Sequence, residues 1–322
     1  MTEKMLIGID IGGTTTKIAL LTNDGAMIEK CAIRTPNKDS GFFLSVTVPE
    51  AVKNLCGHHQ MTKEHVAGIG VGAPGPVHQE TGMFYEITNL DWPDHYPVKE
   101  ILEKSIGLPV RINNDANCAA LGEMWKGAGM GARDLLCITI GTGIGGGVIV
   151  HGSIVHGIRG AAGEIGHITS VLTNGAPCNC GKKGCLETVS SATGIVRLAE
   201  ERIHQDRDPG KRLTSLLAEN GSLTAKDVFS LAGIGDETAL DVVNEAARYL
   251  GIALANIANT LNPEIIIVGG GVSKAGDVLL HPVKSTFAKY IFPASAGATE
   301  IKLAALGNDA GVIGAAWMVR TK

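Results

Sequence analysis

The stretch MLIGIDIGGTTTKIALL, residues 5–21, determines the fold that we expect. It predicts a buried strand over residues 5–9, a glycine turn at 12–13 and a second strand over 15–21. Residues 135–150 repeat this order, with an apolar strand, the glycine-rich turn Gly141–Gly147 and another strand. The chain therefore resembles a diverged duplication, and we expect two facing α/β lobes with a cleft between them.

The remaining pattern alternates strands with helices, which is typical of an α/β layered fold. Apolar spacing of the helical period predicts helices over residues 98–106, 116–125, 195–203, 225–231 and 237–262, with a last one at 309–318. Short apolar runs predict strands around 67–71, 109–112 and 264–268, and a further helix is expected near Ser273.

The composition excludes several classes of protein. With 322 residues, a net charge of -4 and a pI near 6.2, the chain lacks the basic surface that a nucleic-acid binder needs. The N-terminus reaches Asp10 too early for a signal peptide, and no apolar run is long enough to cross a bilayer. We therefore expect a cytoplasmic protein without nucleic-acid or membrane partners.

Three glycine-rich turns are candidate phosphate-binding sites. Backbone N–H groups of glycine turns, threonine hydroxyls and a lysine can all bind phosphate oxygens, and Asp10 can hold Mg²⁺. A hairpin with a glycine bulge, or close packing of a strand on a helix, is the structural alternative for each turn. The candidate residues are Asp10, Gly12, Gly13, Thr14, Thr15 and Lys17 in the first turn, Gly141, Thr142 and Gly143 in the second, and Gly269, Gly270 and Gly271 in the third.

A cluster of cysteines and histidine predicts a structural zinc site. His167, Cys178, Cys180 and Cys185 supply one imidazole and three thiols within 19 residues, enough for tetrahedral Zn²⁺. Glu164 and Glu187 flank this loop, and carboxylates that accept hydroxyl protons suit a polyol ligand. Their alternative roles are those of solvated loop acids or of hydrogen-bond partners of the zinc ligands.

Asp115 is the candidate general base. It follows the strand that ends near Ile112 and precedes the helix over 116–125, where a strand end opens into the expected cleft. Phosphoryl transfer to an alcohol needs a carboxylate within reach of the attacking hydroxyl. The competing role for an aspartate at this position is that of a helix N-cap.

Taken together, these motifs resemble the ROK family, which contains repressors, open reading frames and sugar kinases. The resemblance covers residues 6–316, and its most specific part is GEIGH at 163–167 followed by CNCGKKGCLE at 178–187. It implies the actin-like, ribonuclease H-like sugar kinase fold, with a duplicated βββαβα core and a central cleft. We accordingly expect an N-terminal lobe of residues 1–115 plus about 306–322, and a C-terminal lobe of 116–305 carrying the zinc loop.

The resemblance also implies roles for individual residues and for ligands. Asp115 matches the catalytic base, and the matching sugar contacts are Gly75, Asn89, Asn114, Asp115, Glu164, His167 and Glu187. The implied cofactors are MgATP and structural zinc, and the implied assembly is a homodimer. Residues 119–127 and 305–311 look like the family's glucose kinases of Gram-positive bacteria, so glucose is the expected substrate.

Two alternatives to a glucose kinase remain open at this stage. A kinase for mannose, fructose or an N-acetylated hexosamine would differ only near the sugar's 2-position. A sugar-responsive repressor belongs to a different class, and its N-terminal helix-turn-helix has no counterpart before the first strand.

Overall fold

The computed structural model describes residues 3–85, 87, 90–206 and 211–321. The chain divides into two compact units. Unit 1 comprises residues 1–137, 147–163 and 305–322, and unit 2 comprises 138–146 and 164–304. The lobe limits expected from the sequence, at 115/116 and 305/306, stay a prediction. None of the described helices is long and apolar enough to span a membrane.

Unit 1 is built on a five-stranded sheet with strand order β3-β2-β1-β4-β7. The antiparallel pairs join β1 to β2 and β2 to β3, whereas β1, β4 and β7 run parallel. The carboxyl ends of these three strands therefore share one edge of the sheet. The bounds are Met5–Ile11 (β1), Thr15–Leu21 (β2), Met27–Arg34 (β3), Val66–Ala73 (β4) and Val110–Asn114 (β7), with the short pair Val77–His78 (β5) and Met83–Phe84 (β6).

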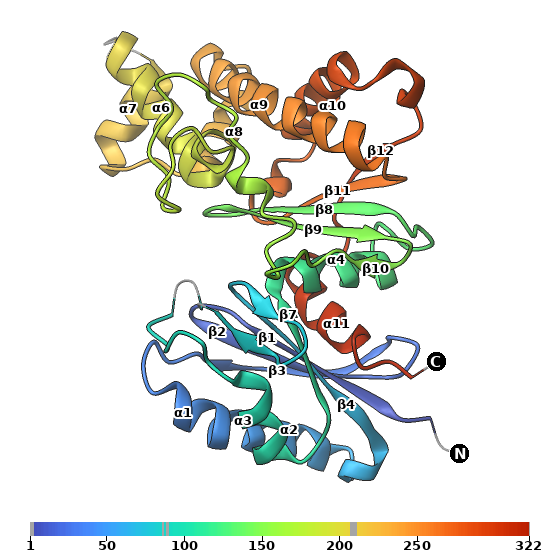
Figure 1. Ribbon diagram of the computed structural model, residues 1–322. Coiled ribbons are helices and arrows are strands. Elements are labelled where there is room, and N and C mark those ends of the chain that lie inside the picture. The colour runs from blue at the N-terminus through green and yellow to red at the C-terminus, as the bar shows by residue number, and fades with distance from the viewer. Residues whose placement is uncertain (1–2, 86, 88–89, 207–210, 322) are drawn as a thin grey trace. The chain divides into compact units, whose positions relative to one another are not determined.

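Helices cover both faces of this sheet (Figure 1). One face carries α1 (Ser40–Phe42), a π-helix (Phe43–Thr47), α2 (Val48–His58) and α3 (Val98–Ile106), and the other carries α4 (Asp115–Lys126) and α11 (Ala310–Trp317). Ile7 and Ile9 pack toward α2 and α3, whereas Leu6 packs with Val312 of α11. This alternation along β1 is the two-residue period of a strand buried on both faces.

Glycines let α11 lie directly on the sheet. A Cβ atom at Gly8 of β1 would lie 2.0 Å from the Val312 carbonyl oxygen, and one at Gly70 of β4 would lie 1.7 Å from that of Ala315. No other residue fits at such distances, so both strands carry glycine where the helix backbone meets them. The last helix of the chain thereby completes the first sheet.

The second sheet has the strand order β10-β9-β8-β11-β12, which corresponds strand for strand to that of the first sheet. The sequence prediction of a duplicated α/β fold is therefore confirmed. Its strands are Leu135–Ile140 (β8), Ile144–Val150 (β9), Ser153–Ile154 (β10), Ile265–Gly269 (β11) and Glu300–Leu303 (β12).

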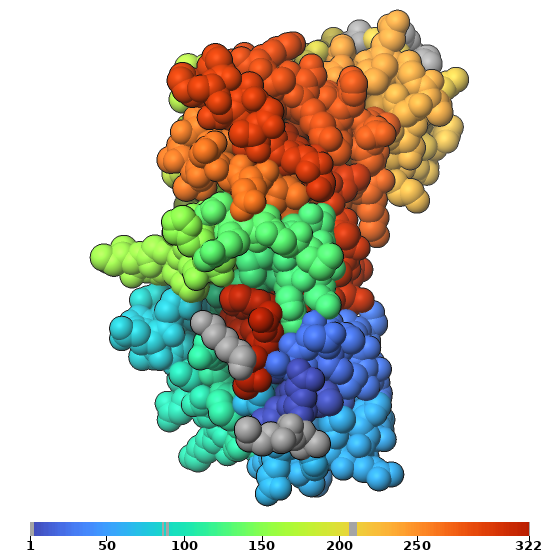
Figure 2. Space-filling view, turned by 90° about the vertical axis from the view of Figure 1, so that its right-hand side faces the viewer, coloured from blue at the N-terminus to red at the C-terminus, as the bar shows by residue number. Residues whose placement is uncertain are grey.

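Helices make up most of unit 2. They are α5 (Glu187–Ser190), α6 (Ala192–Asp206), α7 (Arg212–Asn220), α8 (Ala225–Gly233), α9 (Glu237–Leu261) and α10 (Asp277–Tyr290). Helix α9 starts at its N-cap Asp236, which accepts a hydrogen bond from the Ala239 N–H at 2.9 Å, and it ends at left-handed Asn262 before Pro263. Figure 2 shows α9 and α10, in orange and red, side by side on the surface of unit 2.

Candidate active site and metal centre

The junction of β7 and α4 presents the candidate base. Asn114 is the N-cap of α4, since its Oδ1 accepts hydrogen bonds from the backbone N–H groups of Ala116 and Asn117 at 2.8 and 3.3 Å. Asp115 is the first residue of the helix, and its Oδ1 also lies 2.8 Å from the Ala116 nitrogen. The capping role that competed with catalysis for Asp115 is therefore filled by its neighbour.

Gly75 lies against the same junction. The Asn114 Nδ2 donates to the Gly75 carbonyl oxygen at 3.3 Å, and Gly75 has a φ of 108°, a conformation that other residues rarely adopt. Two of the expected sugar contacts are thus adjacent in unit 1. A third, Asn89, lies outside the described residues.

Asp10 stands at the carboxyl edge of the same sheet, beside Lys17. The Lys17 Nζ lies 3.6 Å from an Asp10 carboxylate oxygen and donates to the Asn308 carbonyl at 2.7 Å. Burial raises the pKa of Asp10, and the nearby Lys17 charge offsets only part of that effect. Gly311 makes room for this carboxylate, because a Cβ atom there would lie 2.9 Å from the Asp10 Cγ.

Asp10 and Asp115 are brought together around Cys118 of α4. Burial is the main reason that the pKa of the Cys118 thiol is raised, and the negative charges of Asp10 and Asp115 raise it further. Both carboxylates therefore lie at the carboxyl edge of the parallel strands, and their role in phosphoryl transfer stays a prediction.

The first glycine turn is an exposed, tight hairpin. The Gly12 N–H donates to the Thr15 carbonyl at 3.1 Å, and the Thr14 carbonyl accepts from the Thr35 N–H at 3.0 Å. Gly13, Thr14 and Thr15 are exposed, whereas Thr16 is buried and hydrogen-bonded to Thr35. The turn leaves backbone and hydroxyl groups accessible at its tip.

The second turn lies against Glu187 in unit 2. A Cβ atom at Gly143 would lie 2.7 Å from the Glu187 Oε2, and this oxygen accepts from the Ile144 N–H at 3.4 Å. The Thr142 carbonyl accepts from the Thr193 hydroxyl at 2.8 Å, and the Gly141 carbonyl from the Ala192 N–H at 2.8 Å. The turn is therefore fixed to the start of α6, and its Gly143 lies beside the Glu187 carboxylate.

The third glycine cluster differs in part from the sequence prediction. Gly270 has a φ of 85° and lies against the Ile140 backbone, which accounts for this glycine by close packing. The helix expected near Ser273 is a single 3-10 turn, Val272–Ala275, and α10 begins only at Asp277. The sharp bend at Gly276 separates the two, so no long helix begins at this cluster.

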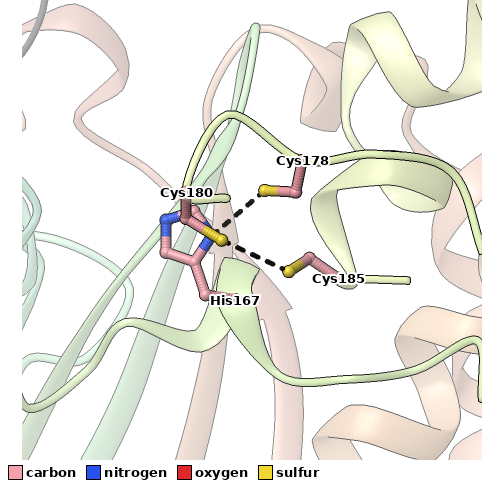
Figure 3. Close-up of side chains that lie close together, drawn as sticks. All are labelled: His167, Cys178, Cys180 and Cys185. Carbon is pink, nitrogen blue, oxygen red and sulfur yellow. Dashed lines mark hydrogen bonds between the residues drawn. The ribbon is translucent and has the colours of Figure 1, made fainter. Parts of the chain in front are cut away.

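The four predicted zinc ligands converge (Figure 3). One ligand atom from each of His167, Cys178, Cys180 and Cys185 lies within 4.8 Å of the others. The imidazole Nδ1 of His167 is 3.5 Å from the Cys178 sulfur, and the sulfurs of Cys180 and Cys185 are 3.6 Å apart. One imidazole and three thiols in this arrangement fit a tetrahedral Zn²⁺.

Both glutamates that flank the loop contact this cluster. The Glu187 Oε1 accepts from the Cys178 thiol at 2.9 Å and lies 3.6 Å from the His167 Nδ1. The Glu164 Oε2 lies 3.9 Å from the other ring nitrogen, Nε2. Burial, and then the hydrogen bond to Glu187, raise the pKa of the Cys178 thiol. Zinc would displace this proton, because cysteine binds the metal as a thiolate.

Several residues near the candidate base were not predicted from the sequence. Asn113 and Asn117 are buried and hydrogen-bonded to each other, and His156 hydrogen-bonds to Asn113. Gly311 and Asn308, described above, complete the surroundings of Asp10 and Lys17. The NND triplet was the available signal for Asn113, whereas nothing in the sequence connects His156 to it.

Two sheets of equivalent strand order, with acidic residues at one sheet edge and a Cys/His cluster, define an α/β protein of the kind found among ROK kinases. The sequence pattern described as "ROK family" matches residues 6–322, and the chain belongs to this family. It is 51% identical to a glucokinase of Halalkalibacterium halodurans, over 99% of this chain and 96% of that protein.

Solved structures agree with this assignment. A ROK family glucokinase from Streptomyces griseus, in complex with glucose and AMPPNP, is 34% identical with a TM-score of 0.77 over 98% of this chain and 99% of that chain. The ROK hexokinase from Thermus thermophilus is 30% identical with a TM-score of 0.79 over 97% of each chain.

Proposed function

We propose that this protein is a glucokinase, which transfers the γ-phosphoryl group of MgATP to the 6-hydroxyl of glucose with Asp115 as general base. The observation that carries the proposal is the β7–α4 junction, where Asn114 caps the helix and Asp115 stands beside it at the strand end. The relatives support the substrates, since one that is 34% identical is described with glucose and an ATP analogue.

In the proposed reaction, the carboxylate of Asp115 accepts the proton of the sugar 6-hydroxyl as that oxygen attacks the γ-phosphorus. The bond from the γ-phosphorus to the bridging oxygen breaks, and ADP leaves. Asp10 would hold Mg²⁺, and Lys17 with the turns at 12–15 and 141–143 would bind the phosphate oxygens. Gly269–Gly271 are assigned to the adenosine side, where bare backbone admits a flat ring.

The sugar hydroxyls are assigned to Gly75, Asn89 and Asn114 in unit 1 and to Glu164, His167 and Glu187 in unit 2. Because the Nδ1 of His167 faces the thiols, its Nε2 is the nitrogen left for a hydroxyl. Zinc held by His167, Cys178, Cys180 and Cys185 would fix the loop that carries these groups. Its role is structural, since four protein ligands leave no open position.

The test is ADP production with MgATP and a panel of glucose, mannose, fructose, N-acetylglucosamine and N-acetylmannosamine. We expect glucose to be preferred, and Asp115→Asn to lower kcat by about 10²–10⁴-fold while glucose binding, measured by calorimetry, survives. The matched control is Asp227→Asn, a capping-box residue of α8 in unit 2, whose kcat should stay unchanged.

Each other result corrects a different part of the proposal. Preference for another sugar would keep the mechanism and change the substrate. An unaffected Asp115→Asn variant would remove the assigned base. If no sugar produced ADP while a sugar still bound, the protein would be a sugar-responsive regulator. The proposal also places the enzyme in the cytoplasm, where MgATP is available, as a homodimer that light scattering would detect.

A further inference from the structure

A hydrogen-bonded asparagine network lies behind the candidate base. Asn113 of β7 is 4% exposed, and its Oδ1 accepts from the Asn114 backbone N–H and from the Asn117 Nδ2, both at 2.9 Å. Its Nδ2 lies 3.0 Å from the Nε2 of His156. The buried amide of Asn113 therefore joins the cap residue of α4 to His156, 43 positions after Asn113 in the chain.

The two donors that reach the Asn113 oxygen fix the orientation of its amide. Since the oxygen faces Asn114 and Asn117, the NH₂ group must face His156 and act as the donor. The His156 Nε2 must then be the acceptor, which requires a neutral ring with its proton on Nδ1. A protonated His156 would direct an N–H at the Asn113 NH₂ group, and the hydrogen bond would be lost.

Stability alone does not account for this network. Among the described residues, the Oδ1 of buried Asn117 has no hydrogen-bond partner. Burying these polar amides costs desolvation free energy that their hydrogen bonds only partly offset. Polar networks kept at such a cost are expected where they hold a functional group in place.

We propose that neutral His156 is a positioning residue for phosphoryl transfer, which holds Asn113 so that the Asn114–Asp115 turn keeps the geometry needed for catalysis. The inference rests on the proposed role of Asp115 as general base. His156 acts through Asn113 and Asn114, and no contact with the substrate is assigned to it.

This arrangement makes the geometry of the Asn114–Asp115 turn sensitive to low pH. Burial of His156 lowers the pKa of its ring, and no charged group contributes to this shift. The titratable side chains of β7 and α4 are Arg111, Asp115, Cys118, Glu123 and Lys126. Arg159 lies in the same loop as His156, and His78 is on β5, against which this loop packs at Gly160. Neutral His156 thus prevails at pH 7, and the Asn114–Asp115 turn loses its support as the pH falls through this lowered pKa.

The experiment compares the pH profile of kcat for three variants, with glucose and MgATP saturating. His156→Gln keeps an acceptor that does not titrate, so kcat at pH 8 should stay within about threefold of wild type and its acid loss should be reduced. His156→Leu leaves the Asn113 NH₂ buried without a partner, and kcat at pH 8 should fall about tenfold. The control His281→Gln, at an exposed position of α10, should retain the wild-type profile.

The results separate the inference from the proposed function. An acid limb in His156→Gln identical to that of wild type would overturn the positioning role, even if His156→Leu failed to fold. If wild type phosphorylated no sugar, the proposed function would fail, and NMR of nitrogen-labelled histidine would still test the network. The expected state at pH 7 is an unprotonated Nε2 on His156, and a protonated Nε2 would contradict the inference.

Discussion

Asp10 is the residue where stability and the proposed activity oppose each other most directly. Burial raises its pKa even though Lys17 is 3.6 Å away, so desolvation outweighs the ion pair. The folded protein therefore holds an Asp10 proton more tightly than the unfolded chain does. At pH 7, where Asp10 is ionised in the unfolded chain, this residue lowers the stability of the fold, and that loss is regained as the pH falls through the raised pKa.

Asp10→Asn should accordingly stabilise the protein and impair it as an enzyme. We expect Tm at pH 7 to rise by about 2 °C because the buried charge is removed. We expect kcat to fall about 100-fold because Mg²⁺ loses a carboxylate. Calorimetry and the ADP assay measure the two effects.

Asp24→Asn is the matched control for this substitution. Asp24 lies in an exposed turn, and the hydrogen bond from the Thr22 hydroxyl is the main reason that its pKa is lowered. Removing that carboxylate should not raise Tm. A fall in Tm for Asp10→Asn would mean that the ion pair with Lys17 stabilises the fold more than burial of the charge weakens it.

Among the elements, the loop of residues 168–186 depends most on its predicted metal. It is held by a few backbone contacts, such as Cys178 N–H to the Lys182 carbonyl at 2.8 Å and Gly184 N–H to the Ala176 carbonyl at 2.9 Å. Gly184 is required by crowding, because a Cβ atom there would lie 2.0 Å from the Val171 carbonyl oxygen. Such a loop has no apolar core of its own, and four metal bonds would supply its rigidity.

Cys180→Ser should therefore empty the site and loosen the loop. Bound zinc, measured by mass spectrometry, should fall from about one to below about 0.1 per chain. Limited proteolysis should then cut within residues 168–186, and the KM for glucose should rise because Glu164 and His167 lose their fixed positions. Cys31→Ser, outside the cluster, should keep its zinc, and full zinc occupancy in Cys180→Ser would refute the assigned ligand set.

Elements with a clear period were predicted closely. The strand 15–21 and the helix 98–106 have the bounds that the structure gives, and the predicted helix 116–125 extends by one residue at each end. The helical segment 40–58 was not predicted. It begins at left-handed Asp39 without a side-chain cap and passes through a π-helix, whose wider turn breaks the apolar spacing.

The candidate site shows the same contrast. Residues whose roles follow from nearby sequence were predicted, whereas a residue placed by a tertiary contact was not. The zinc ligands were predicted because they lie within 19 residues of one another, and their convergence is now described. Asp115 and Asn114 follow from the strand-to-helix transition. His156 could not be predicted, because its contact with Asn113 depends on the path of the loop after β10, which leaves no periodic pattern in the chain.

At the scale of the whole molecule, Glu123 forms hydrogen bonds with the chain where the chain re-enters unit 1 at Ala305. This fully buried carboxylate accepts backbone N–H groups from Ala128, Ala305 and Leu306 at 2.8, 3.0 and 2.8 Å. Gly127 is required beside it, since a Cβ atom there would lie 2.0 Å from the Glu123 Oε2. One side chain on α4 thus holds two segments far apart in the sequence.

Glu123→Gln should be strongly destabilising despite its similar shape. A glutamine places an NH₂ group against at least one backbone N–H, which leaves buried donors without an acceptor. We expect the free energy of unfolding in urea to fall by about 2–4 kcal/mol. Glu219→Gln, on the exposed end of α7, should change it by less than about 0.5 kcal/mol. Equal urea midpoints for Glu123→Gln and wild type would show that the carboxylate is dispensable.

The position of α11 has a consequence for co-translational folding. The strands that carry Gly8 and Gly70 are synthesised early, but the helix that occupies the space over them comes from residues 310–317. Residues 138–146 and 164–304, which make up unit 2, have all been synthesised before residues 305–322 of unit 1, so unit 2 is complete while unit 1 still lacks its last segment. The usual order of co-translational folding, N-terminal domain first, is therefore reversed here. Until α11 has been synthesised, only α4 covers this face of the first sheet, and this interval is when a chaperone would be needed most.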